Sequence, residues 1–95
     1  MARILAVDDE PNIVRLIQVS LERAGYEVET ATNGTEALAK IKNRRPDLMV
    51  SDVMMPQMDG LELLTSVRRD PNLESLPIVL LTAKSQDLDI VKGYE

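Results

Sequence analysis

The chain of 95 residues contains no cysteine, histidine, phenylalanine or tryptophan. Without cysteine it can form neither a disulfide nor a thiolate metal site, and without histidine it has no imidazole base or imidazole metal ligand. Its two tyrosines offer no platform for stacking nucleic-acid bases. Any chemistry must therefore use carboxylates, hydroxyls, lysine, arginine or backbone groups, with an oxygen-bound metal as the remaining class of cofactor.

Clustered positive charge and long apolar runs are also absent. The 16 acidic and 11 basic residues give a net charge of −5, which argues against direct binding of nucleic acid or of an anionic membrane. No apolar run approaches the ~20 residues that span a bilayer, and the N-terminal apolar stretch is too short for a signal peptide. We expect residues 1–95 to form a single globular domain located in the cytoplasm.

Two periods of apolar residues alternate along the chain. Apolar runs bounded by acidic residues, glycine or proline predict buried strands at 4–7, 48–50 and 78–81, and a weaker, more alternating pattern predicts an edge strand at 28–31. Helical spacing predicts four helices, the last over Ser85–Glu95. Their inward faces are expected to carry Ile13, Leu16, Ile17, Leu21 and Ala24; Ala37, Leu38 and Ile41; Leu61, Leu64 and Val67; and Leu88 with Val91.

Strands that alternate with helices predict βαβ units with right-handed crossovers and a parallel sheet. We expect an α/β fold of the flavodoxin-like, doubly wound type with strand order 2-1-3-4. A complete sheet of this type needs a further strand beyond 78–82, so the chain is expected to lack the last βα unit and to be C-terminally incomplete. The outer edge of strand 78–82 would then be exposed, which favours self-association through that edge or by exchange of the last helix.

Oxygen-bearing side chains follow three of the predicted strands. Asp8 and Asp9 follow the first strand, Asp52 follows the third, and Thr82 follows the fourth. In an open parallel sheet, ligands bind beyond the carboxyl ends of the strands, where the strand order reverses. Each of these residues taken alone is also typical of a helix cap or a turn, but their coincidence at one edge favours a site. Close carboxylates repel one another, and the hard cation Mg²⁺ would offset their charge.

Three segments resemble the signature segments of the response-regulator receiver domain of two-component signalling. They are Asp8-Asp9, the stretch 48–60 that contains Asp52, Met54, Pro56 and Gly60, and Leu80-Leu81-Thr82-Ala83-Lys84. The segments stand in the order and at the spacing of that family, and the resemblance covers the whole chain. It implies that Asp52 is the phosphoacceptor, which takes a phosphoryl group from a phosphohistidine on a sensor histidine kinase or a His-phosphotransfer protein.

The same resemblance implies how a metal is held. Mg²⁺ would be bound by Asp9, Asp52 and the backbone carbonyl of Met54, with Asp8 acting through a water molecule. Phosphorylation would switch the conformation of the domain and so signal to an output domain or output protein. The domain would not be an enzyme beyond self-phosphotransfer and autodephosphorylation.

The remaining implied positions lie in the third segment. Thr82 would hydrogen-bond the phosphoryl group and move with it, small Ala83 would leave room for it, and Lys84 would be a neighbour of it. The family also has a lysine followed by proline at the end of a fifth strand, and this sequence ends before that strand. Lys84 is not that residue, so phosphotransfer in this form is expected to be weak or absent.

Three alternatives stay open from the residues. One is a truncated fragment that folds and self-associates without taking a phosphoryl group. Another is an Asp-nucleophile phosphatase, whose site commonly has a second Asp two residues after the first, where this chain has Met54. The third is a flavin- or nucleotide-binding domain, which would need a phosphate loop after the first strand, where Asp8-Asp9-Glu10 would repel phosphate.

Overall fold

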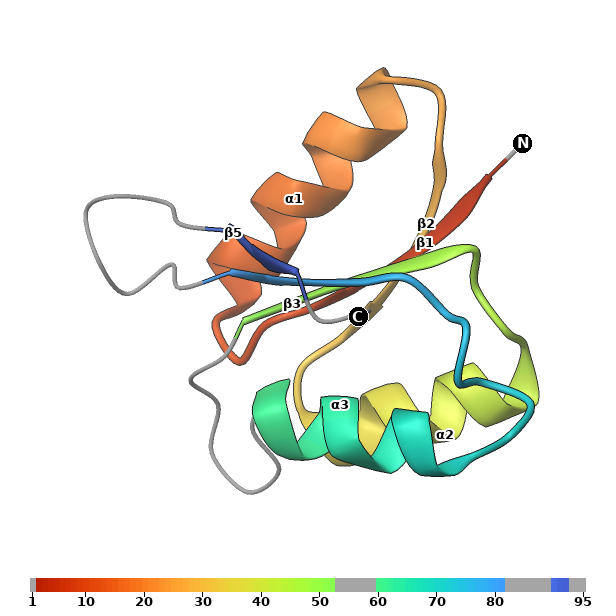
Figure 1. Cartoon of the computed structure of the whole chain (residues 1–95). Coiled ribbons are helices and arrows are strands. Elements are labelled where there is room, and N and C mark those ends of the chain that lie inside the picture. The colour runs from red at the N-terminus through yellow and green to blue at the C-terminus, as the bar shows by residue number, and fades with distance from the viewer. Residues whose placement is uncertain (1, 53–59, 82–89, 93–95) are drawn as a thin grey trace.

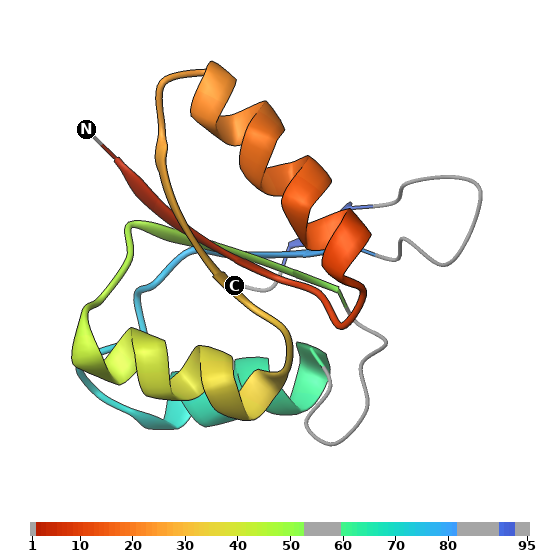
Figure 2. The same cartoon turned by 180° about the vertical axis from the view of Figure 1, so that it is seen from behind.

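The computed structural model of the chain describes residues 2–52, 60–81 and 90–92, and the statements below concern these ranges. The described elements alternate between strands and helices, as predicted, up to β4. In order they are β1 (Arg3–Val7), α1 (Pro11–Arg23), β2 (Glu27–Ala31), α2 (Gly34–Asn43), β3 (Leu48–Asp52), α3 (Gly60–Arg69), β4 (Ile78–Leu81) and β5 (Ile90–Lys92). Figure 1 shows the sheet between α1 on one face and α2 with α3 on the other, and Figure 2 shows the same layers from behind.

The sheet has the order β2-β1-β3-β4-β5, and its first four strands are parallel. The predicted order 2-1-3-4 and the flavodoxin-like, doubly wound class are therefore confirmed. Strand β1 lies between β2 and β3, so the strand order reverses beside β1. The register places Val7 opposite both Ala31 and Ser51, and it places Asp52 opposite Leu81. The carboxyl ends of β1 and β3 thus finish at the same edge of the sheet.

Local signals explain where the helices begin and end. Pro11 occupies the first turn of α1, and Gly25 just beyond that helix has a φ of 97°, a left-handed conformation that glycine adopts without strain. The Asn33 side chain caps α2 by accepting a hydrogen bond from the backbone N–H of Glu36 at 2.7 Å.

Among the described residues, no helix is both long and apolar enough to cross a membrane.

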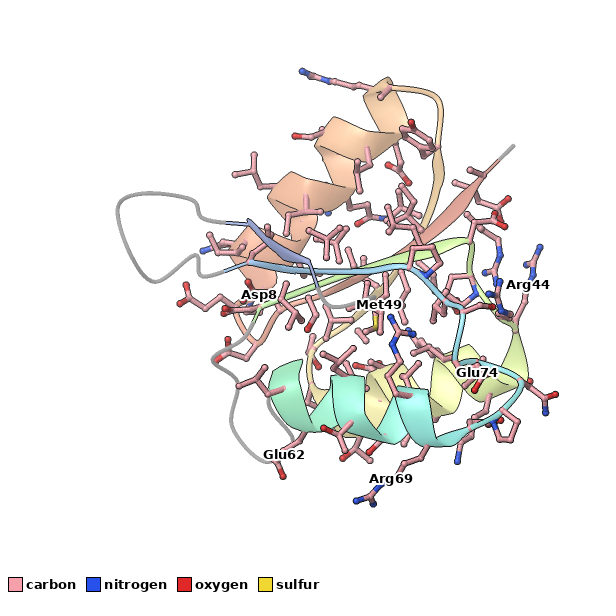
Figure 3. The ribbon with its side chains drawn as sticks, in the orientation of Figure 1. Asp8, Arg44, Met49, Glu62, Arg69 and Glu74 are labelled. Atoms are coloured by element: carbon pink, nitrogen blue, oxygen red, sulfur yellow. The ribbon has the colours of Figure 1, made fainter. Side chains whose placement is uncertain are left out.

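The densest core lies between the sheet and the α2/α3 layer. Leu5, Met49 and Leu80 from three neighbouring strands are each at most 1% exposed, and they belong to one buried cluster with Ile41 of α2 and Val67 of α3. Figure 3 shows Met49 between the sheet and these helices. Burial of each such side chain stabilises the fold by ~1.5–3 kcal/mol, so this face supplies much of the stability.

The opposite face is covered less completely. Helix α1 packs mainly on β2 and β1, and Val14 is its buried residue. Val50 of β3 and Val79 and Leu81 of β4 alternate with the fully buried residues of their strands and are only half-buried. The two faces of the sheet therefore differ in how much stability their apolar side chains provide.

Two leucines that were predicted to face inward are exposed instead. Leu16 in α1 is 63% exposed and Leu61 in α3 is 53% exposed, whereas Val14 and Leu63 are buried. Helical spacing identifies an apolar stripe, but in a short helix with neighbouring apolar residues it does not fix which of two adjacent stripes meets the sheet. The prediction of the inward positions was wrong at these two leucines and at Ala24, which is also exposed.

The C-terminal expectation also needs correction. The predicted helix over Ser85–Glu95 is wrong at Ile90–Lys92, which form strand β5 antiparallel to β4, while the rest of that segment lies outside the described residues. The predicted exposure of the outer edge of strand 78–82 is wrong for the same reason, because β5 pairs with residues 79–81. An apolar edge gains hydrogen-bond partners by such pairing, and β-branched Ile90 and Val91 suit a strand.

Candidate functional site

The register of the parallel strands brings Asp8 and Asp52 together. Val7 lies opposite Ser51, so the next residues along β1 and β3 are Asp8 and Asp52. Both side chains are almost fully buried, with 2% exposure for Asp8 and 1% for Asp52. Figure 3 shows Asp8 at one end of the sheet and Arg44 near the other. The edge of the sheet predicted from the sequence therefore does carry the acidic residues.

Asp9 completes a cluster of three carboxylates. One oxygen from each of Asp8, Asp9 and Asp52 lies within 4.8 Å of the others. Asp9 follows β1 on the turn that leads into α1 and is half-buried. The N-cap of α1 is Glu10, whose side chain makes no capping hydrogen bond. The alternative that Asp8 and Asp9 merely cap α1 is therefore not supported.

The environment of Asp8 disfavours its charged form. Burial, together with the neighbouring charges of Asp52 and Asp9, raises the pKa of the Asp8 carboxyl to about 6, although the hydrogen bond from the backbone N–H of Glu10 opposes this shift. That N–H donates to Oδ1 of Asp8 at 2.9 Å. A carboxylate under such repulsion interacts favourably with a cation.

Two contacts at the site were not predicted. The N–H of Glu10 closes an Asx turn on Asp8, a pattern that the Asp-x-Glu-Pro sequence could have suggested. The buried Ser51 hydroxyl donates to the backbone carbonyl of Asp52 at 3.0 Å. No signal in the sequence separates such a serine from an ordinary strand residue.

The remaining predicted site residues lie outside the described residues. They are Met54, Thr82, Ala83 and Lys84. The described part of the site thus consists of the three carboxylates, the N–H of Glu10 and the backbone around Asp52.

The donor set of the cluster fits a hard divalent cation. It consists of carboxylate oxygens alone, and two of them, Asp9 Oδ1 and Asp52 Oδ2, are buried atoms. Mg²⁺ prefers oxygen ligands, uses one or two carboxylates and keeps several waters. The described residues therefore form an acidic pocket whose composition suits such an ion.

A doubly wound parallel sheet with an acidic pocket at its switch point defines the class of this protein. It is an α/β domain of the type in which ligands bind beyond the carboxyl ends of the strands, where the strand order reverses. The sequence profile described as response regulator receiver domain matches residues 4–95. The chain belongs to this family, and the predicted membership is confirmed.

Relatives and solved structures agree with this assignment. The chain is 48% identical over 93 residues to the alkaline phosphatase synthesis transcriptional regulatory protein PhoP of Bacillus subtilis, a match that covers 98% of this chain and 38% of PhoP. A crystal structure of the N-terminal domain of a response regulator receiver protein from Methanoculleus marisnigri superposes with a TM-score of 0.85 at 41% identity, covering 92% of this chain and 71% of that one.

One similar structure contains ligands. The response regulator protein TrrA of Thermotoga maritima in complex with Mg²⁺-BeF has a TM-score of 0.81 and 46% identity, covering 87% of this chain and 70% of that one. The chain spans about 38% of PhoP and similar fractions of the other curated relatives that it matches.

Proposed function

We propose that this receiver domain takes a phosphoryl group onto Asp52 with the help of Mg²⁺ held in the acidic pocket. The observation that carries the proposal is the convergence of the Asp8, Asp9 and Asp52 carboxylates within 4.8 Å at the switch point of the sheet. The resemblance of residues 48–60 and 80–84 to the receiver segments supports it.

In this mechanism Asp52 is the nucleophile. A carboxylate oxygen of Asp52 attacks the phosphorus in line, an O–P bond forms, the P–N bond to the donor imidazole breaks, and the imidazole leaves with the electron pair. Phosphoryl transfer depends mainly on positioning and on compensation of charge. The end of β3 fixes the backbone at Asp52, and the Ser51 hydroxyl holds its carbonyl at 3.0 Å.

The three acidic residues would contact the ion in different ways. Asp9 and Asp52 would bind Mg²⁺ directly together with the backbone carbonyl of Met54, and Asp8 would act through a water. When bound there, the ion would neutralise the charge that builds up on the phosphoryl oxygens. The turn hydrogen bond from Glu10 keeps the Asp8 carboxylate oriented toward the pocket.

Thr82, Ala83 and Lys84 complete the proposed phosphoryl site. Thr82 would donate its hydroxyl to the bound phosphoryl group, Ala83 would leave room, and Lys84 would lie near the group as a cation. New contacts that form only after phosphorylation would bias the conformation of the domain.

The proposed partners follow from this chemistry. The phosphoryl donor would be a sensor histidine kinase or a His-phosphotransfer protein in the cytoplasm, and the signal would pass to an output domain or protein. The domain would act as a phosphoacceptor with self-phosphotransfer and autodephosphorylation as its only reactions, and not as an enzyme with a separate substrate. The predicted self-association through residues 78–82 lacks its structural basis, because β5 pairs with residues 79–81 on that edge.

Labelling with acetyl phosphate in the presence of Mg²⁺ tests the proposal. Labelling of the unaltered chain is expected to be weak in this form, and Asp52→Asn should abolish whatever base-labile acyl phosphate the chain forms. Asp70→Asn is the matched control, because it makes the same substitution outside the acidic pocket. Asp70 lies on the turn after α3, where its Oδ1 accepts a hydrogen bond from the N–H of Asn72. Unchanged labelling of Asp52→Asn would overturn the assignment of the phosphoacceptor.

A second measurement separates metal binding from phosphoryl transfer. A Mg²⁺ titration monitored by nuclear magnetic resonance should show weaker Mg²⁺ binding in Asp9→Asn than in Asp8→Asn. The reason is that, of these two residues, only Asp9 is proposed to bind the ion directly. Equal affinities in these two variants would contradict the proposed ligand set while leaving the role of Asp52 to the labelling experiment.

A further inference from the structure

Ser51 places a hydroxyl group on the apolar face of the sheet, one residue before the proposed phosphoacceptor. Side chains alternate along β3, so Ser51 shares the face of Met49, which Figure 3 shows between the sheet and α2 with α3. The register sets Ser51 beside Val7 of β1 and Leu80 of β4. Both neighbours are at most 1% exposed, and Ser51 itself is 0% exposed. Its hydroxyl is therefore buried beside apolar side chains.

The hydroxyl of Ser51 constrains the backbone of the next residue. A buried hydroxyl needs an acceptor, because leaving it without one costs free energy. Ser51 donates to the backbone carbonyl of Asp52 at 3.0 Å. The carbonyl accepts this bond only when the peptide group that follows Asp52 is turned toward the hydroxyl. The hydrogen bond thus restricts rotation about the Cα–C bond of Asp52.

This constraint acts at the point where one ladder of the sheet stops. The register between β1 and β3 ends at the pair of Val7 and Ser51, so Asp52 is the first residue of β3 beyond it. On that side of the strand, Asp8 and Asp9 form the acidic pocket together with Asp52. The hydrogen bond from Ser51 therefore orders the backbone one residue past the β1 ladder, at the edge of the pocket.

Rotation of the peptide group after Asp52 matters for a bound cation. The Cα atom of Asp52 carries both the carboxylate that is proposed to bind Mg²⁺ and the chain that continues toward Met54, whose carbonyl is a second proposed ligand. The direction in which the chain leaves β3 therefore determines where this carbonyl can lie relative to the Asp9 and Asp52 carboxylates. Metal ligands bind tightly when neighbouring groups hold them in place.

We propose that Ser51 is a positioning residue for the cation site. Its hydroxyl holds the carbonyl of Asp52 and so fixes the direction in which the chain leaves β3, which keeps the ligand groups at and after Asp52 in place for Mg²⁺. Ser51 acts through the backbone, because its side chain lies on the opposite face of β3 from that of Asp52. The inference rests on the proposed function of the acidic pocket.

Mg²⁺ titrations monitored by nuclear magnetic resonance test the proposal. Ser51→Ala removes the hydroxyl, and its Mg²⁺ affinity should be about tenfold lower than that of the unaltered chain, as for loss of a group that orients metal ligands. Thr65→Ala is the control, because it removes a hydroxyl that donates to the carbonyl of Leu61 at 3.0 Å on the exposed side of α3. Its Mg²⁺ affinity should equal that of the unaltered chain. Equal affinities in Ser51→Ala and Thr65→Ala would overturn the proposal.

A second pair of variants separates the hydroxyl from the shape of the side chain. Ser51→Thr and Ser51→Val introduce β-branched side chains of nearly the same size, and only threonine keeps the donor. The Mg²⁺ affinity should stay close to that of the unaltered chain in Ser51→Thr and be about tenfold lower in Ser51→Val. A serine that served only the fold would change the free energy of unfolding and leave the Mg²⁺ affinity of the folded chain unaltered, so equal affinities in this pair would also overturn the proposal. If the added methyl group prevents folding of the pair, the comparison with Ser51→Ala decides.

Asp52→Asn distinguishes failure of this inference from failure of the proposed function. If Asp52→Asn lowers the Mg²⁺ affinity while Ser51→Ala binds Mg²⁺ as the unaltered chain does, the pocket binds the cation and only the role of Ser51 is overturned. If the unaltered chain binds no Mg²⁺, the proposed function fails and the role of Ser51 fails with it. Without Mg²⁺, the carbonyl carbon resonance of Asp52 should shift in Ser51→Ala, because the hydrogen bond to that carbonyl is lost. An unchanged resonance would overturn the proposal.

Discussion

The backbone N–H of Glu10 lies 2.9 Å from Oδ1 of Asp8 and donates a hydrogen bond to it. This bond crosses the junction between β1 and α1, so the start of the helix fixes the orientation of a buried carboxylate. It favours the charged form of Asp8, whereas burial and the charges of Asp52 and Asp9 favour the neutral form and dominate the pKa. The charged form of Asp8 is therefore unfavourable at this junction, and a bound cation would stabilise it.

The first prediction concerns pH in a magnesium-free buffer. Because the pKa of Asp8 is raised to about 6, the folded chain binds this proton more tightly than the unfolded chain. The Asp8 contribution to stability is therefore full at low pH and falls as the pH rises from about 4 to about 7. In Asp8→Asn this fall should disappear, and the free energy of unfolding near neutral pH should increase by about 1–3 kcal/mol, since each unit of pKa difference corresponds to about 1.4 kcal/mol.

Urea unfolding of both proteins at several pH values measures this effect. Asp70→Asn serves as a control for loss of one negative charge at a distance from the pocket. A variant Asp8→Asn that is less stable than the unaltered chain at neutral pH would contradict the interpretation. Addition of Mg²⁺ should reduce the difference in the free energy of unfolding between Asp8→Asn and the unaltered chain, because the ion compensates the Asp8 charge that the variant removes.

The second prediction concerns Glu36. Its pKa is lowered, mainly because the backbone N–H of Thr32 donates to its carboxylate. A carboxylate with a lowered pKa stabilises the fold above its unfolded-state pKa, and this stabilisation is lost as the pH falls through the folded-state pKa. Glu36→Ala should lower the free energy of unfolding by about 1 kcal/mol at neutral pH and by less in acid, as for loss of a cap. Glu74→Ala is the exposed control, and equal effects in both variants would refute this role.

Much of the architecture follows from pattern alone. The alternation of apolar runs and helical spacing predicts the order of the elements, because parallel strands buried on both faces and amphipathic helices leave different periods. Asp8 and Asp52 could be placed together because both directly follow strands that the predicted order makes neighbours. Their proximity depends on topology and register, which the strand-end positions encode.

Other features depend on choices that no local pattern settles. Leu61 and Leu63 are equally apolar, and only packing against the sheet decides which one is buried. Ile90 and Val91 fit either a helix face or a strand, and the open edge of β4 selects the strand. The ammonium of Lys40 reaches the carbonyl of Thr30 because α2 packs against β2, and this packing is a property of the assembled layers.

The third prediction compares the two faces of the sheet at neighbouring positions of β4. Leu80 faces the dense core and is 1% exposed, whereas Val79 faces the α1 side and is half-buried. Leu80→Ala should destabilise the chain by ~2–5 kcal/mol, in the range of buried large-to-small changes. Val79→Ala should have a clearly smaller effect in the same urea titration. Similar losses at the two positions would mean that the α1 side is as well packed as the α2/α3 side.

The fourth prediction concerns Arg3, a charged residue that is only 8% exposed. Its Nη1 donates to Oε1 of Glu29 in β2 at 3.3 Å. Its Nη2 donates to the carbonyls of Arg44 and Arg45 at 2.8 and 3.2 Å, beyond the end of α2. One guanidinium thus joins β1, the edge strand and the turn that enters β3. These contacts lie at the end of the sheet away from Asp8, so they serve the fold and not the pocket.

Arg3→Met should therefore lower the free energy of unfolding by about 1–3 kcal/mol, because it leaves partly buried carbonyls and a carboxylate without their donor. Arg3→Lys should recover only part of this loss, since one ammonium cannot span the acceptors that the planar guanidinium joins. Arg15→Met, at an exposed position of α1, controls for the loss of a positive charge. Mg²⁺ affinity should stay unchanged in all three variants, because the acidic pocket lies at the opposite end of the strands from Arg3. A full recovery by Arg3→Lys in urea unfolding would show that charge alone, and not the geometry of the guanidinium, stabilises this end of the sheet.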